Sequence, residues 1–148
     1  MSSRASIAKH PIHPMLVVFP IGLWIFSFVC DLIFFFGSGA TLWNDVAYIA
    51  MAGGIIGALI AAVPGFIDFL TLEGTARKTA TVHMTINLSL VVLFAINLYA
   101  RAIGAQVDSY PIILSAIGVI GLGVSGWLGG QLVYVHSIAV ECGTEQRV

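Results

Sequence analysis

Four apolar runs, each about as long as a bilayer is thick, dominate this sequence of 148 residues. They cover about residues 14–36, 44–70, 80–101 and 111–136, and short stretches of glycine and polar residues separate them. Because a helix needs about 20 mostly apolar residues to cross the hydrocarbon core, each run predicts one membrane-spanning helix. A chain with 59% hydrophobic and 9% charged residues also cannot give a soluble domain its polar surface. We therefore predict an all-α integral membrane four-helix bundle that forms a single domain over residues 1–148.

The short connections make neighbouring helices antiparallel, so the bundle should run up-down-up-down with both termini on one side of the membrane. The basic residues then divide unequally between the two sides. The side of the termini receives Arg4, Lys9, Arg77, Lys78 and Arg147, whereas the other side receives Arg101. Because positively charged loops stay in the cytoplasm, we expect a multi-pass protein of the bacterial inner membrane with both termini cytoplasmic.

Glycines in the second and fourth runs predict close packing of helices. In lipid, helices associate through small residues that let their backbones approach. Gly53 and Gly57, and likewise Gly126 and Gly130, have the spacing of a small-xxx-small pair. A glycine face left over after packing within the bundle would favour a homo-oligomer.

One carboxylate, Asp31, lies inside the first apolar run, just before the sequence Leu-Ile-Phe-Phe-Phe. A charge at that depth must be paired, protonated or next to water. We interpret Asp31 as a helix-end residue that reaches the interface beside a polar neighbour such as Asn44 or Trp43. A proton or ion relay is the alternative interpretation.

All four histidines fall on the side of the termini, and they are the main candidate site residues: His10, His13, His83 and His136. The first two belong to the segment His-Pro-Ile-His-Pro, whose prolines fix their own backbone torsion and hold the preceding residues extended. Imidazoles on such a rigid segment are preorganised as ligands. Neutral imidazole is the commonest metal ligand, and axial histidines often hold haem iron.

Residues near two of these histidines favour the same chemistry. His83 and Asn87 are four residues apart and share one face of the predicted third helix. The face of His136 on the predicted fourth helix continues through Gly129 and Ser125, which leaves a strip without bulky side chains. A flat ligand such as haem could lie on that strip. The predicted cofactor-binding residues are therefore His13, His83, His136, Asn87 and Gly129.

Several segments of the chain together resemble the bacterial membrane family called domain of unknown function 2231. These segments are HPIHPMLVVFPIGL at residues 10–23, AAVPGFIDF at 61–69, His83 with Asn87, and GWLGGQLVYVH at 126–136. The resemblance spans nearly the whole chain and implies a four-helix architecture. Some relatives are joined to a Rieske-type iron-sulfur domain, which implies a redox setting for His13, His83 and His136. This chain contains no Cys-x-His pair of its own.

Three functions remain open. The leading hypothesis is a small cytochrome b-like protein that holds haem b with histidine ligands near the cytoplasmic face and transfers electrons. The alternative is a non-haem site for Zn, Fe or Cu, with Asp68 as a ligand or as an acceptor for an imidazole N–H; Asp68 could instead pair with Arg77. Its predicted ligands are His10, His13, His83, His136 and Asp68. The third hypothesis is a non-catalytic subunit or anchor of a redox complex.

The expected partners follow from composition and from these hypotheses. They are the lipid bilayer, a redox partner protein and further copies of the chain. A nucleic acid is excluded because the formal net charge of −1 provides no basic footprint. An enzymatic activity is not expected of the chain alone, because no Glu-x-x-His or His-Glu-x-x-His motif is present.

Overall fold

The computed structural model describes residues 3–8, 10–37, 39–104 and 110–138, and most of them are helical. Five helices follow one another along the chain: α1 (Ile12–Leu16), α2 (Val18–Phe36), α3 (Thr41–Phe69), α4 (Gly74–Ala102) and α5 (Tyr110–Tyr134). Two short antiparallel strands, β1 (Ser6–Ile7) and β2 (His10–Pro11), precede them. Since α1 and α2 together form one apolar segment, the described residues contain four helical segments long and apolar enough to cross a membrane. The predicted all-α fold is confirmed.

Prolines and polar residues explain where the helices differ from the predicted ranges. Pro20 has no N–H for the carbonyl of Leu16, and the first span is interrupted by a turn at Val17 while its backbone stays helical. The third span begins at Gly74 rather than near residue 80. The predicted start marked where the apolar residues begin, whereas polar residues outside the lipid can also be helical. α3 contains Pro64 and continues through it to Phe69.

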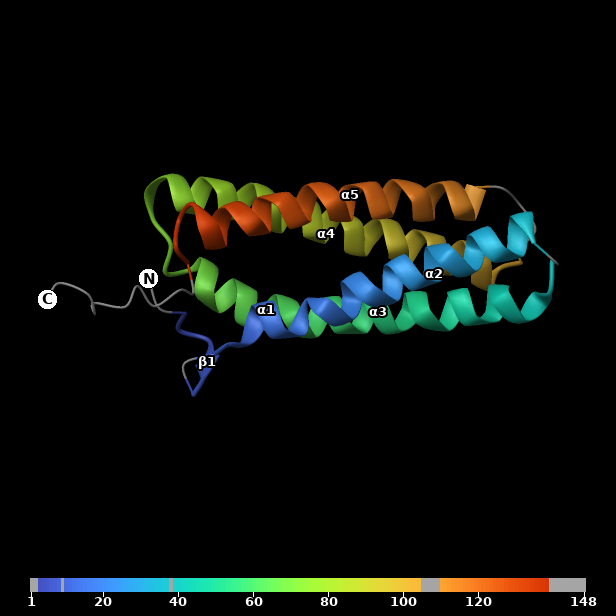
Figure 1. The fold of residues 1–148 in the computed structure, drawn as a ribbon, viewed down its shortest axis with the longest axis horizontal. Helices are drawn as coiled ribbons and strands as arrows, with labels where there is room; N and C mark the ends of the chain where they lie inside the picture. Colours follow the sequence, from blue (N-terminus) through green and yellow to red (C-terminus); the bar gives the residue numbers. More distant parts are fainter. Residues whose placement is uncertain (1–2, 9, 38, 105–109, 139–148) are drawn as a thin grey trace, which may run out of the picture.

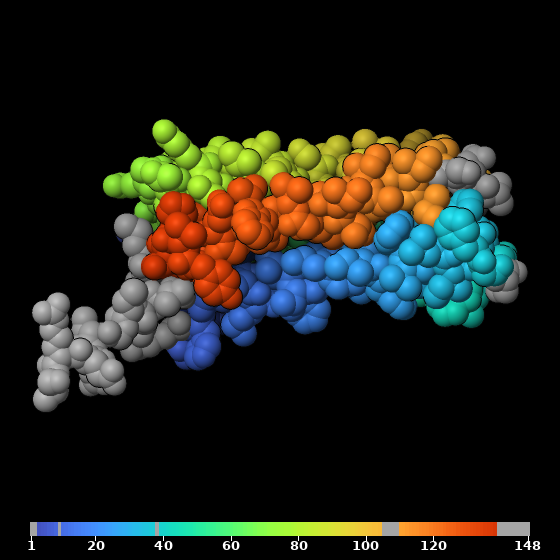
Figure 2. Space-filling view, turned by 45° about the horizontal axis from the view of Figure 1, so that its top comes forward, coloured from blue at the N-terminus to red at the C-terminus, as the bar shows by residue number. Residues whose placement is uncertain are grey.

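The helices form two antiparallel hairpins that pack against each other. The first hairpin consists of α1, α2 and α3, and the second hairpin consists of α4 and α5 (Figure 1). Both hairpins start at the same end of the molecule, on the left in Figure 1, which we call the histidine end because the helices that start there, α1 and α4, carry His13 and His83. Figure 2 shows α5 and α2 lying side by side along the length of the bundle.

The middle of the bundle is held by two stacked aromatic rings. Trp24 and Phe94, one from each hairpin, stack with their centroids 4.2 Å apart and their planes 15° apart. The indole N–H of Trp24 also donates to the carbonyl of Met51, at 3.3 Å. Two glycines make room for the rings, since a Cβ at Gly54 would lie 2.4 Å from Trp24 and one at Gly118 would lie 2.4 Å from Phe94. The core therefore joins the hairpins through aromatic contact.

The outer surface is apolar, as a lipid-facing surface must be. Large apolar side chains are exposed on every span, with exposed fractions of 69% for Ile49, 58% for Val92 and 70% for Ile120. Inside, every buried side-chain nitrogen and oxygen atom of the described residues has a hydrogen-bond partner. An apolar outside with paired polar groups inside is the arrangement expected of a protein that lies in lipid.

Candidate functional site

His83 points from α4 to the backbone of α5. Its Nδ1 lies 3.0 Å from the carbonyl oxygen of Ser125 and 3.1 Å from the Ser125 hydroxyl. A carbonyl oxygen can only accept, so the hydrogen sits on Nδ1. One turn further along α5, a Cβ at Gly129 would lie 3.4 Å from the ring. The predicted strip of Gly129 and Ser125 therefore exists, but the imidazole beside it is that of His83.

Asn87 completes the hydrogen bonds of the His83 ring. Its Nδ2 donates to the His83 carbonyl at 2.9 Å, which fixes which way the amide points. The same nitrogen lies 3.1 Å from His83 Nε2, so the imidazole accepts a hydrogen bond there. Both ring nitrogens of His83 are thus bonded, in a pattern that suits a neutral imidazole.

His13 makes the corresponding contact within the first hairpin. Its Nδ1 lies 2.8 Å from the carbonyl oxygen of Ala61 in α3, so this ring also carries its hydrogen on Nδ1. Gly65, one turn further along α3, lets the ring lie against the helix, because a Cβ there would be 2.7 Å from Nδ1. His13 is also close enough to His83 for electrostatic interaction between the two rings.

The other predicted ligands do not join this pair. His10 is exposed, and its Nδ1 bonds the Ala8 carbonyl at 2.9 Å. His136 lies beyond the end of α5, in a turn where its backbone N–H donates to Gln131. Within residues 3–8, 10–37, 39–104 and 110–138, no group of three His, Cys, Asp or Glu side chains could hold a metal ion.

Asp68 binds the N-terminal segment. The Ser3 hydroxyl lies 2.8 and 2.9 Å from its two carboxylate oxygens, and the Ala5 N–H donates to it at 3.0 Å. Arg77, its alternative partner in the sequence analysis, instead lies over the Phe69 ring at 4.9 Å and donates to the Leu72 carbonyl. Asp68 therefore holds Ser3 and Ala5 against the end of α3.

Replacing Asp68 with alanine should release this N-terminal segment. The variant loses hydrogen bonds to a charged acceptor, which contribute about 1.5–3 kcal/mol each, so hydrogen exchange at the Ala5 amide should accelerate about tenfold or more. Ser3→Ala serves as the matched control and should have a smaller effect, because the Ala5 bond remains. Unchanged exchange at Ala5 in the Asp68 variant would contradict this role.

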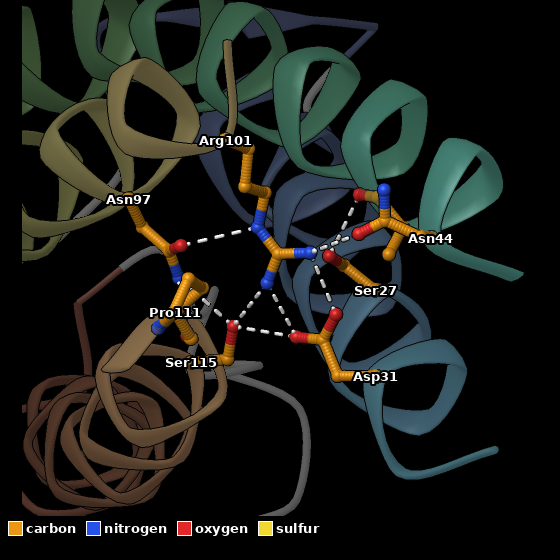
Figure 3. Close-up of polar contacts among 8 residues, drawn as sticks. Ser27, Asp31, Asn44, Asn97, Arg101, Pro111 and Ser115 are labelled. Atoms are coloured by element: carbon orange, nitrogen blue, oxygen red, sulfur yellow. Dashed lines mark hydrogen bonds and ion pairs between the residues drawn. The ribbon is translucent and has the colours of Figure 1, made fainter. Parts of the chain in front are cut away.

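A second polar cluster, which we call the ion-pair network, lies near the ends of α2 and α4, at the end of the bundle opposite the histidine end. Figure 3 shows its residues. Arg101 forms a bidentate pair with Asp31, with both N···O distances 2.7 Å, and each residue is only 2% exposed. Arg101 Nε also donates to Asn97 Oδ1 at 3.1 Å, and its terminal nitrogens lie 3.5 Å from Asn44 and 3.3 Å from Ser115. The five N–H groups of the guanidinium therefore all have acceptors.

The remaining atoms of the ion-pair network are equally well matched. The Ser115 hydroxyl donates to Asp31 at 2.8 Å and accepts from Asn97 Nδ2 at 2.9 Å. The other Asn97 N–H donates to the Pro111 carbonyl, also at 2.9 Å. Since the members come from α2, α3, α4 and α5, the network joins all four spans (Figure 3).

This network corrects two interpretations from the sequence. Arg101 is not a charge in the loop outside the membrane but a buried cation in the bundle. Asp31 is not a helix-end residue at the interface, although Asn44 does lie at the edge of its network. The sequence did contain a signal for this pair. A charge buried in an apolar span requires an opposite charge at the same depth, and Arg101 is the one Lys or Arg near the end of the spans where Asp31 lies.

Four apolar helices with a lipid-facing outside and paired polar groups inside define an α-helical membrane protein with four candidate spans. The chain belongs to the family described as predicted membrane protein (DUF2231), whose profile matches residues 9–142. The resemblance noted in the sequence is thereby confirmed. A search of curated proteins and a search of solved structures each found no match.

Proposed function

We propose that this protein holds haem b through His13 and His83 and transfers electrons at the membrane. The observation that carries the proposal is the shared anchoring of the two rings. Each donates its Nδ1–H to a backbone carbonyl of the neighbouring helix, that of Ala61 or of Ser125. Histidines that ligate metals are typically held in this way, because the bond fixes the tautomer and directs Nε2 toward the metal.

The number of imidazoles favours haem over a non-haem ion. A structural zinc site takes about four protein ligands, whereas haem needs one or two axial histidines because the macrocycle supplies the other nitrogens. His13 and His83 interact electrostatically, and no third His, Cys, Asp or Glu of the described residues joins them in a group that could hold a metal ion. Bound haem would supply a one-electron carrier, and the chain's own residues would orient its ligands. Asn87 would have to give up its bond to His83 Nε2 before that nitrogen could bind iron.

The charges support a cytoplasmic position for the histidine end in a bacterial inner membrane. Arg4, Arg77 and Lys78 belong to this end, whereas Arg101 at the opposite end is neutralised by Asp31. Lys9 and Arg147, which the sequence also assigned to the cytoplasmic side, lie outside the described residues. Without Arg101, the loops at the other end contribute no positive charge, which strengthens the positive-inside argument.

The bond between Asn87 and His83 favours a second candidate function, a non-catalytic subunit or anchor of a redox complex. In that case the histidines serve only to link helices, and their hydrogen bonds are already complete within the chain. Haem would then bind neither the wild-type protein nor any variant.

The haem content of protein purified from haem-supplemented cells separates these functions. We expect about one haem per wild-type chain and almost none in His13→Ala or His83→Ala. His10→Ala, which removes an exposed histidine outside the pair, is the matched control and should keep its haem. Asn87→Leu should bind haem at least as well as the wild type, because it frees Nε2 of His83. Loss of haem in His10→Ala equal to that in His83→Ala would contradict the assignment of the ligands.

A further inference from the structure

Residues that occupy equivalent positions in the two hairpins are separated by a constant number of positions in the sequence. On the helices that begin each hairpin, equivalent residues are 70 positions apart. Trp24 meets Phe94 and Asp31 meets Arg101 at this spacing, and the same spacing relates His13 to His83. On the returning helices, α3 and α5, a spacing of 64 relates Gly54 to Gly118, Gly57 to Gly121, Ala61 to Ser125 and Gly65 to Gly129.

The contacts inside each hairpin repeat with the same spacings. His13 bonds the carbonyl of Ala61 as His83 bonds that of Ser125, at 2.8 and 3.0 Å. Gly54 lies against Trp24 as Gly118 lies against Phe94. Near the other end, Ser27 donates to the Ala47 carbonyl at 2.8 Å, and Asn97 donates to the Pro111 carbonyl at 2.9 Å. Three independent contacts thus recur between equivalent positions.

Contacts between the hairpins join each residue to its own equivalent. Trp24 stacks on Phe94, and Asp31 pairs with Arg101. Both hairpins start at the histidine end (Figure 1). The two hairpins run in the same direction, and equivalent residues meet each other between them. This is a pseudo-two-fold arrangement with its axis along the bundle, as in the parallel repeats of membrane proteins.

We infer that the chain is a duplicated two-helix hairpin, and that Asp31 and Arg101 make each hairpin surface a docking site for the opposite hairpin. Two copies of the first hairpin would place Asp31 against Asp31, and two copies of the second would place Arg101 against Arg101. Buried like charges disfavour both pairings, whereas the unlike pairing gives the bidentate ion pair seen here. The partner that this surface fits is therefore a hairpin of the same fold and the opposite buried charge.

Exchange of the charges in the full-length protein tests this inference. In detergent, Asp31→Arg and Arg101→Asp should each lower the melting temperature by about 10 °C or more, or prevent folding, because each leaves like charges facing each other. The double variant, with the charges exchanged, should recover part of this loss. Its recovery is incomplete because the guanidinium introduced at position 31 would lack the acceptor that Asn97 gives Arg101.

Exchanging Ser27 and Asn97, the equivalent polar residues beside the ion pair, makes the test specific for the duplication. Ser27→Asn and Asn97→Ser, added to the charge exchange, should raise the melting temperature above that of the double variant, because an asparagine at position 27 can bond both the introduced guanidinium and the Ala47 carbonyl. The same two substitutions without charge exchange are the control and should lower stability, since Arg101 Nε loses its acceptor. The inference is overturned if the four-residue variant is no more stable than the single-charge variants, or if those variants match the wild type.

Discussion

Replacing Asp31 with leucine should destabilise the protein by about 3–5 kcal/mol, because it leaves the Arg101 guanidinium buried without its counter-ion. The pair is 2% exposed on each side and bidentate at 2.7 Å, so neither water nor a second carboxylate among the described residues replaces Asp31. The free energy of unfolding, measured by denaturant titration in mixed detergent micelles, checks this value.

The double variant Asp31→Leu with Arg101→Met is the control that separates a charge effect from a packing effect. A buried ion pair costs much of its attraction in desolvation, so an apolar pair of similar volume is often neutral or better. We expect the double variant to recover most of the stability that Asp31→Leu loses. A double variant less stable than the single one would show that packing at this site, and not the unpaired charge, sets the energy.

Replacing Gly118 with alanine should cost about 3 kcal/mol, although alanine is the better helix former. Its Cβ would lie 2.4 Å from the Phe94 ring, which is fully buried and stacked on Trp24. The ring therefore cannot move away without breaking the stack between the hairpins. Unfolding in micelles measures the loss, and the altered tryptophan fluorescence of the folded state reports the shifted ring.

Gly123→Ala is the matched control on the same helix. No atom lies within 4 Å of a Cβ built at Gly123, so this variant should be as stable as the wild type or slightly more stable. Equal losses in the two variants would mean that helix α5 does not pack on Phe94 as described.

The helices were predictable from the sequence, but the rotation of each helix about its own axis, which decides the residues that face its neighbours, was not. Four runs of the length of a bilayer are enough to identify four spans. Gly53 and Gly57 do face the helix before them, with Leu23 and Pro20 each 3.3 Å from an added Cβ. At Gly126 an added Cβ would meet no atom within 4 Å, and at Gly130 only the side chain of Tyr134, so that pair does not pack between helices. Spacing along one helix cannot show which face meets a neighbour.

The candidate site was predictable in part for the same reason. Topology alone grouped the histidines at one end, and His83 does share a helix face with Asn87. Which carbonyl each ring meets depends on residues 42 or 48 positions away, and no local pattern records such contacts. Asp31 and Arg101, 70 positions apart, illustrate the same difficulty, because each looks acceptable as an isolated interfacial charge.

An oxidised-minus-reduced absorbance spectrum of the wild-type protein, with haem content measured on the same sample, tests the proposed function most directly. With His13 and His83 as ligands, the spectrum should show the Soret and α-band changes of a haem held by two imidazoles, and His83→Ala should lose them. A folded protein from haem-supplemented cells with no Soret band would contradict the proposal.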